Sequence, residues 1–164
     1  MIEVRNYVAG KWVDPGGARF KSFNPYTGEV LSSAPESDAQ AVDAAVSAAR
    51  RAFDEGEWRW LLGSQRAAAL LAFADELEQR ARPISELIAR EMGKPVTVNL
   101  TRELESAVDK LRYYAGTARM IDGRVTGGTL PEVWDIELPE PIGVCALIIP
   151  WNDPVDLAVR KMGA

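Results

Sequence analysis

Cysteine and histidine are the residue types that most often supply a nucleophile or a general base, and this sequence has one cysteine and no histidine. Without an imidazole, these residues cannot form a Ser-His-Asp triad, a Cys-His pair or a zinc site with histidine ligands. The single cysteine also excludes an internal disulfide. Acid–base chemistry in this chain must therefore come from carboxylates, lysine, tyrosine or a bound cofactor.

The one cysteine, Cys145, lies inside the apolar run from Gly143 to Ile149. The run has the length and composition that are typical of a strand buried on both faces of a parallel α/β sheet. No basic residue adjoins Cys145 in the sequence to favour its thiolate. We therefore expect an unreactive thiol in the core rather than a nucleophile.

The loop after this run is the strongest candidate for a site. Pro150 and Pro154 bound a break in the apolar pattern, and helical periodicity begins at Val155. Ligands of open α/β sheets bind at the carboxyl ends of buried strands, so the order of strand, tight loop and helix predicts a site at residues 150–153. A parallel sheet needs further strands beside this one, so we expect the sequence to be an interrupted part of a longer one.

Short strands and then helices are expected to precede this strand. Residues 7–13 predict a β-hairpin, residues 24–29 a turn and residues 30–31 the start of another strand. Residues 133–138 alternate imperfectly between apolar and polar and predict a partly exposed strand that projects from the body. Helical spacing predicts four helices, which begin at Ser37 (with Gln40 completing a capping box), at Ser64 (ending near Arg80), at Pro83 (ending at Gly93) and at Thr97 (ending near Ile121).

Composition indicates one globular domain, because the 164 residues are 47% hydrophobic and 26% charged. The net charge is -5, and the basic residues are dispersed among acidic ones, which argues against nucleic-acid binding. The N-terminus has no basic segment followed by an apolar run, and no apolar stretch reaches the length of about 18 residues that spans a membrane. We therefore expect a cytoplasmic protein.

Four stretches resemble the aldehyde dehydrogenase superfamily in their order and spacing, over nearly the whole chain. The most specific is Glu-Pro-Ile-Gly-Val-Cys at residues 140–145, which leads into Ile-Pro-Trp-Asn at residues 149–152. The other three are Asn-Pro-Tyr-Thr-Gly-Glu at 24–29, Gly-Lys-Pro at 93–95 and Leu-Arg-Tyr-Tyr-Ala-Gly at 111–116. The sequence has no Gly-x-Gly-x-x-Gly fingerprint, so a cofactor, NAD or NADP, is implied by the resemblance and by the order of strand, loop and helix.

The resemblance implies an α/β fold of aldehyde dehydrogenase type. It is an incomplete Rossmann-type cofactor domain with N-terminal short strands, a helical layer and a protruding oligomerisation β-arm. Residues 1–122 would form the N-terminal part of the cofactor-binding domain, and residues 123–141 the strands of the arm. Residues 142–164 would supply the first buried strand, the loop and the helix start of the Rossmann-type sheet, and the catalytic domain would be absent.

The implied reaction oxidises an aldehyde to a carboxylic acid through a cysteine thioester, and hydride passes to the nicotinamide. In the family, the asparagine of the Pro-Trp-Asn motif donates its amide to the oxyanion of the intermediate, so Asn152 would take that role. Lys161 falls on a lysine that some members use in a proton relay. The backbone of four residues would line the cofactor: Ile148, Ile149, Pro150 and Trp151. The family's nucleophilic cysteine and general-base glutamate lie beyond these residues, so the chain alone is expected to be inactive.

The implied partners are a small-molecule aldehyde and further copies of the chain, in a homodimer or homotetramer, with no metal. Each site residue also has a structural interpretation: Asn152 could serve only a turn, Trp151 only packing, and Lys161 only a solvated helix face. Two positions depart from the family pattern, because Asp153 stands where an aromatic residue is usual and Ala146 where glycine is common. An acid beside Asn152 could alter the cofactor pocket.

The alternative function is that of a naturally short, catalytically dead protein, which binds a partner through its β-arm or its helices. It differs from the enzyme hypothesis in whether the natural chain continues beyond residue 164. A free-standing helical adaptor is a third and more remote hypothesis. The expected buried strand and the Pro-Trp-Asn motif both count against the adaptor.

Overall fold

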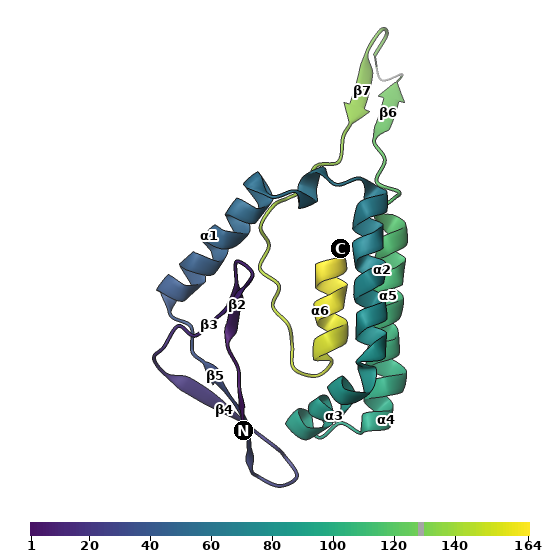
Figure 1. Ribbon diagram of the computed structural model, residues 1–164. Helices are drawn as coiled ribbons and strands as arrows, with labels where there is room; N and C mark the ends of the chain where they lie inside the picture. Colours follow the sequence, from purple (N-terminus) through teal and green to yellow (C-terminus); the bar gives the residue numbers. More distant parts are fainter. Residues whose placement is uncertain (128–129) are drawn as a thin grey trace.

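The computed structural model describes residues 1–127 and 130–164. Short strands form the N-terminal part, helices form the body, and a β-hairpin projects from one end of the helices (Figure 1). The second and third strands are joined by the turn that the sequence predicts. β2 (Asn6–Val8) pairs antiparallel with β3 (Lys11–Val13), and Ala9 and Gly10 connect them with φ values of 50° and 76°. Positive φ at both positions of a two-residue turn matches the twist of the strands, and the predicted hairpin is confirmed.

A second small sheet has the strand order β1-β5-β4. β4 (Arg19–Phe23) runs antiparallel to β5 (Val30–Pro35), and β1 (Ile2–Glu3) lies parallel to β5 on its other edge. The turn between β4 and β5 is the one predicted at residues 24–29. The side chain of Asn24 accepts the backbone N–H of Tyr26 at 2.9 Å, which closes this turn locally.

The helices follow the apolar periodicity of the sequence closely. The three that were predicted from Ser37, Ser64 and Pro83 are confirmed within a few residues, and the fourth consists of three successive helical segments. The bounds are α1 (Ala39–Glu55), the 3₁₀ turn η1 (Trp58–Trp60), α2 (Gly63–Gln79), α3 (Ala81–Met92), α4 (Val96–Val98), the π-helical segment η2 (Asn99–Leu104), α5 (Glu105–Thr117) and α6 (Pro154–Gly163).

The cap of α1 differs from the predicted one. Asp38 caps the helix, and its carboxylate accepts the N–H of Ala41 at 2.8 Å. The hydroxyl of Ser37 instead accepts the side-chain amide of Asn6 at 2.7 Å. Aspartate is as good a helix cap as serine, so the predicted capping box of Ser37 and Gln40 is wrong by one position.

The fourth helical stretch ends at Thr117, earlier than the predicted end near Ile121. The N–H groups of the next two residues after Ala118 turn back to residues three positions before them, which tightens the chain out of the α-helix. The start of α2 lies against this end, since a Cβ at Gly63 would overlap the carbonyl oxygen of Ala118. Close packing between α2 and α5 therefore accompanies the early end.

The core is formed by residues of α2, α3, η2, α5 and α6, and Figure 1 shows α2 and α5 side by side with α6 alongside them. Alanine at two fully buried positions lets the helices approach closely, because its side chain is small. The cluster consists of Ala74, Leu77, Ile88, Leu104, Ala107, Val108, Leu111 and Val159. This packing fixes α6 on the body and hence the loop that precedes it.

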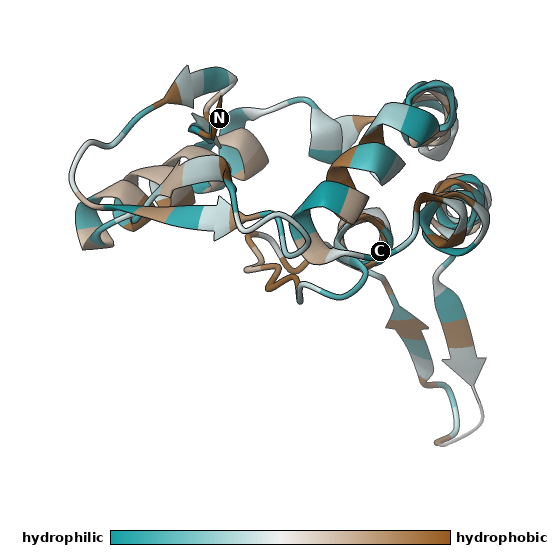
Figure 2. Ribbon diagram, turned by 90° about the horizontal axis from the view of Figure 1, so that it is seen from below, coloured by the Kyte–Doolittle hydropathy of each residue, from teal (hydrophilic) through white to brown (hydrophobic). Residues whose placement is uncertain are grey.

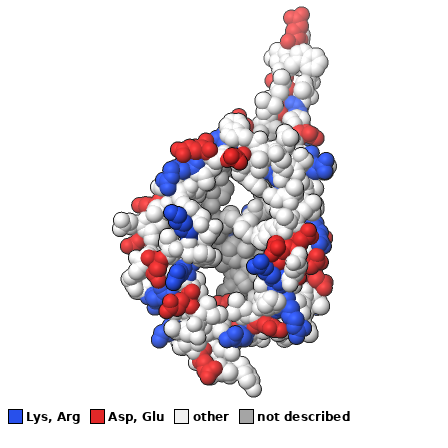
Figure 3. Space-filling view, viewed as in Figure 1, with Lys and Arg blue, Asp and Glu red and all other residues white. Residues whose placement is uncertain are grey.

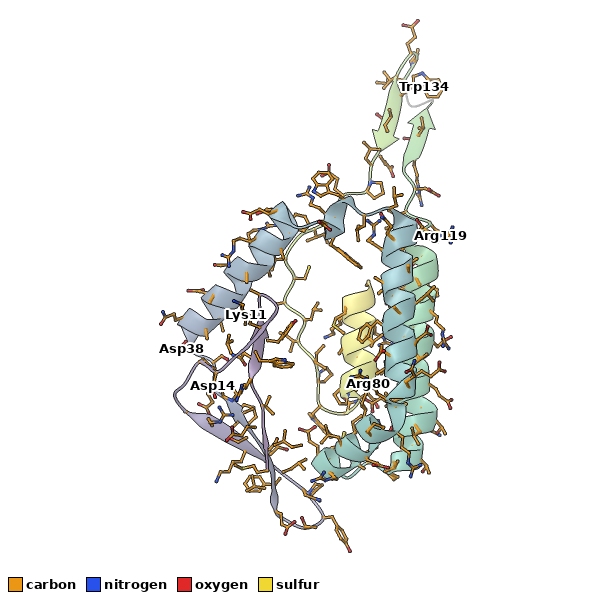
Figure 4. The ribbon with its side chains drawn as sticks, viewed as in Figure 1. Lys11, Asp14, Asp38, Arg80, Arg119 and Trp134 are labelled. Atoms are coloured by element: carbon orange, nitrogen blue, oxygen red, sulfur yellow. The ribbon has the colours of Figure 1, made fainter. Side chains whose placement is uncertain are left out.

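The projecting hairpin pairs β6 (Arg124–Gly127) antiparallel with β7 (Trp134–Glu137). All residues of both strands are exposed. Trp134 stands on the hairpin away from the helices, and Arg119 lies near its base (Figure 4). The exposed strand predicted at 133–138 is thus present at β7; the predicted arm also includes Gly128 and Thr129, which lie outside the described residues.

The buried strand predicted at residues 143–149 is wrong. In the described part of the chain this segment pairs with no strand, and Ile148 is 80% exposed. Figure 2 shows its hydrophobic colouring. A strand needs a neighbour for its N–H and C=O groups, and none is available among these residues. Cys145 is accordingly exposed, so the prediction of a thiol in the core is also wrong.

Within residues 1–127 and 130–164, no helix combines the length and the apolar character needed to cross a membrane.

Candidate active site

The predicted site lies at the N-terminal end of α6. Residues 150–153 lead into this helix at Pro154, which suits the first turn because its missing N–H would have no helical partner. The N–H of Val155 is bound by the Oε1 of Glu103 at 2.9 Å. Glu103 lies on η2, and its side chain is 0% exposed. A carboxylate at this point stabilises α6 because helix N-termini carry unpaired N–H groups and a partial positive charge.

Lys94, in the loop between α3 and α4, joins Glu103 to the predicted site. Its Nζ donates to the Oε2 of Glu103 at 2.7 Å and to the Oδ1 of Asp153. The carbonyl oxygen of Asn152 lies 3.4 Å from the same nitrogen. These three acceptors match the three hydrogens of an ammonium group. Lys94 therefore ties the loop to the buried carboxylate at two consecutive residues.

Opposing effects act on the charge of Lys94. Burial lowers the pKa of Lys94, while hydrogen bonds to Asp153 and Glu103 raise it by more, so this pKa lies above its ordinary value of 10.5. The ammonium therefore stays charged through the neutral range. Its backbone is also held, because the amide nitrogen of the buried Asn99 donates to the carbonyl oxygen of Lys94 at 3.2 Å.

Asn152 presents its side-chain amide at the surface. The Nδ2 atom donates to the Oδ2 of Asp153 at 3.0 Å. Among the residues that the structure describes, no other acceptor lies within hydrogen-bonding distance of this nitrogen, and an amide has two hydrogens. One N–H therefore remains for an external acceptor.

Lys161 lies in the last turn of α6, and its Nζ donates to the carbonyl oxygen of Ile148. Asn152 precedes the first turn of the same helix, so about two turns separate it from Lys161. Residues 148–151 consequently run back along α6 from one end to the other. The structure brings Lys161 together with the predicted cofactor-lining segment, and Asn152 together with Asp153, but it does not bring Lys161 to Asn152.

Residues 12–164 match the family described as the aldehyde dehydrogenase family. The chain belongs to this family. Aldehyde dehydrogenase family 2 member B4, mitochondrial, of Arabidopsis thaliana is 39% identical over 160 residues, which are 95% of this chain and 29% of that protein. The resemblance to this family that the sequence motifs indicate is therefore confirmed.

Solved aldehyde dehydrogenases have the same fold. An aldehyde dehydrogenase from Bacillus cereus (E194S mutant) has a TM-score of 0.92 at 34% identity, over 98% of this chain and 33% of that chain. The Mycobacterium tuberculosis aldehyde dehydrogenase complexed with NAD+ has a TM-score of 0.89 at 33% identity, over 99% and 34%. The predicted α/β fold of aldehyde dehydrogenase type is confirmed, and the chain spans about a third of the length of the relatives it matches.

Two functional candidates in this member of the aldehyde dehydrogenase family cannot be found from sequence motifs. Lys94 belongs to the Gly-Lys-Pro stretch, but nothing in that stretch indicates its ionic partners. The position of Glu103 in the sequence does indicate burial, since it lies four residues before Ala107 and eight before Leu111, both buried. A glutamate in line with an apolar helix face is expected to be paired, and here Lys94 and Val155 pair it.

Surface recesses lie elsewhere in the described part of the chain. A recess of about 380 Å³ lies between the start of α2 and the end of α5, and one of about 340 Å³ lies at the base of the β6–β7 hairpin. Neither contains a predicted site residue. Nor do the described residues bring together three or more His, Cys, Asp or Glu side chains that could hold a metal ion.

Proposed function

We propose that these residues form the N-terminal portion of an NAD(P)-dependent aldehyde dehydrogenase in which Asn152 stabilises the oxyanion. The observation that carries the proposal is the Asn152 amide, which is exposed at the start of α6 and has one N–H available. The family membership and the position of the loop support it. Cytoplasmic location, the division into domains and the proton-relay role of Lys161 stay predictions.

In the proposed reaction, a cysteine thiolate from outside these residues adds to the aldehyde carbon, which forms a C–S bond and moves an electron pair onto the oxygen. The Asn152 N–H donates to that oxygen. Because this donor is oriented before the charge develops, the stabilisation requires little reorganisation. Hydride then leaves the carbon, and water, deprotonated by a glutamate from outside these residues, hydrolyses the thioester to the acid and the thiol.

The proposed cofactor is NAD or NADP, which supplies the hydride acceptor when bound. The predicted lining segment fits one wall of such a site, because Ile148 and Trp151 are 80% and 78% exposed and offer apolar surface. Lys161 fixes this wall by binding the carbonyl oxygen of Ile148. The NAD+ complex of the Mycobacterium tuberculosis relative supports this assignment.

The mass of the intact gene product in its own cells tests the proposal first. We expect a mass about three times the 18.0 kDa of these residues, because the chain spans about a third of its relatives. We also expect the purified 164-residue chain to reduce neither NAD nor NADP with any aldehyde, because Cys145 has no histidine to activate it.

Either result can contradict this proposal. Robust aldehyde-dependent turnover by the purified chain would mean that Cys145 or another residue acts as the nucleophile. A cellular mass near 18.0 kDa would favour the alternative of a short, catalytically dead protein that binds a partner. A cofactor-binding assay on the same material would then show whether residues 148–151 retain any affinity.

We further infer that the β6–β7 hairpin joins copies of the dehydrogenase in a homodimer or homotetramer. Trp134 and Ile136 are 75% and 66% exposed on it. On the face shown in Figure 3, charges of both signs are intermingled over the body, whereas an uncharged area lies below the tip of the hairpin. Exposed aromatic and aliphatic residues grouped on a projecting element are typical of protein interfaces.

Substitution Trp134→Lys in the complete enzyme is expected to weaken association by at least about tenfold, because a buried interface tryptophan contributes on the order of 2 kcal/mol or more. Light scattering after size-exclusion chromatography measures the native mass over a dilution series. Tyr26→Lys is the matched control, since Tyr26 is 94% exposed on the β4–β5 turn. An unchanged mass for Trp134→Lys at every dilution contradicts the role of the hairpin.

A further inference from the structure

Asp153 connects the exposed Asn152 amide with the buried ion pair of Lys94 and Glu103. We propose that Asp153 is a positioning residue, which orients the Asn152 amide for the oxyanion while Lys94 and Glu103 hold Asp153 in place. The inference rests on the proposed function of Asn152. Family resemblance does not supply it, since an aromatic residue is usual at this position.

The two oxygens of the Asp153 carboxylate have different partners. Oδ1 accepts from Lys94, and Oδ2 accepts the Nδ2 of Asn152 at 3.0 Å. An ionised carboxylate accepts hydrogen bonds and donates none, so only the nitrogen end of the asparagine amide can face it. The carboxylate therefore selects one of the two amide orientations and directs the second N–H away from itself.

Lys94 fixes the carboxylate itself. Its side chain is 18% exposed, and its Nζ also donates to the Oε2 of Glu103 at 2.7 Å. The Glu103 side chain is itself held in place, because it is 0% exposed and its other oxygen accepts the N–H of Val155. The series from Glu103 through Lys94 and Asp153 to Asn152 thus begins in the core and ends at the proposed oxyanion donor.

Charge balance makes an acid tolerable beside a developing oxyanion. A free carboxylate at this point would repel the oxyanion, whereas Asp153 is bound directly to an ammonium group. Hydrogen bonding keeps the pKa of Lys94 above its ordinary value, so the compensating positive charge persists across the neutral range. An aromatic side chain at residue 153 would have neither the acceptor for Asn152 nor the charge for Lys94.

The first part of the test is an NMR experiment, which does not depend on enzymatic activity. The sequence has four asparagines, Asn6, Asn24, Asn99 and Asn152, so 15N-asparagine labelling gives four pairs of side-chain amide signals in the NMR spectrum. Asn152→Ala assigns the signal of interest. In the wild-type chain one Asn152 proton is expected to be shifted downfield and to exchange slowly, and both properties should be lost in Asp153→Ala. The pKa of Lys94, followed at its ε-methylene, should fall in Asp153→Asn.

The second arm measures kinetics in the complete dehydrogenase. Asp153→Ala is expected to lower kcat by about tenfold to hundredfold, with KM for the aldehyde nearly unchanged, because a misplaced donor affects the chemical step. Asp153→Asn keeps an acceptor oxygen and should restore part of kcat. In the Asn152→Ala background, Asp153→Ala should have no further effect, because Asp153 acts through Asn152.

Asp156→Asn is the matched control, because Asp156 is also paired with a lysine, Lys110, and lies three residues further on. It should change neither the Asn152 signal nor kcat. An Asn152 signal that is the same in wild type and Asp153→Ala overturns the inference, as does a rise in kcat on removing Asp153. A full kcat in Asn152→Ala instead overturns the proposed function, and the two failures are thereby distinguished.

Discussion

Replacement of Asn152 by alanine in the complete dehydrogenase is expected to lower kcat by about 10²–10³-fold, while KM for the aldehyde changes little. In the proposed reaction, negative charge develops on the substrate oxygen as the thiolate adds, so a donor aimed at this oxygen stabilises the transition state more than the bound aldehyde. The start of α6 should survive the substitution, because Glu103 caps this helix through Val155.

Steady-state rates from the absorbance of the reduced nicotinamide, over a range of aldehyde concentrations, separate kcat from KM. Asn6→Ala serves as the control, since its amide also donates one side-chain hydrogen bond, to Ser37, and neither residue belongs to the loop. Wild-type kcat in Asn152→Ala contradicts the role of this amide. An effect confined to KM would mean that Asn152 binds the substrate without stabilising the oxyanion.

Local patterns predicted most of the fold, because most of its elements are determined by neighbouring residues. Helix periodicity located α2 and α3 within a few residues, and the left-handed Gly93, with φ 78°, ends α3 where the sequence indicates. The hairpin at residues 7–13 followed in the same way from its turn. The cap of α1 was misplaced by one residue, since Ser37 and Asp38 are adjacent and both can cap a helix.

The apolar segment at 143–149 shows where local pattern reasoning fails. Its apolar composition indicates that both faces of a strand here would be buried, but burial and strand pairing depend on neighbouring strands that are distant in the sequence. Among the described residues those partners do not exist, and the segment forms no strand and is largely exposed. The same reasoning placed Cys145 in the core, so one missing tertiary condition accounts for both errors.

The candidate site was predictable in place but not in its supporting contacts. The Pro-Trp-Asn stretch located Asn152, and the break between two periodicities located the loop. The network behind it joins Lys94 to residues nine and fifty-nine positions away, Glu103 and Asp153. Spacing of this kind carries no periodic signal, because it arises where η2 and the loop after α3 meet the loop before α6.

Glu103→Ala is expected to lower the free energy of unfolding of the 164-residue chain by about 3–5 kcal/mol, the range for breaking a buried ion pair from one side. The substitution leaves Lys94, whose side chain is 18% exposed, with Asp153 as its remaining anionic partner. It also removes the acceptor of the Val155 N–H at the start of α6. Glu103→Gln retains an acceptor oxygen for Val155 and should therefore lose less.

Urea unfolding followed by circular dichroism measures these differences, and Glu105→Ala is the control because Glu105 is an exposed glutamate two residues further on. A loss no larger for Glu103→Ala than for Glu105→Ala contradicts the importance of the pair. The pH dependence gives a separate check. Because the pKa of Lys94 is raised on folding, the stability that its partners contribute is fully present below pH 10.5 and is lost as the pH rises through the folded value. Glu103→Gln should therefore lose less stability than the wild type above pH 10.5, and an identical decline in both would show that Lys94 and Glu103 are not coupled.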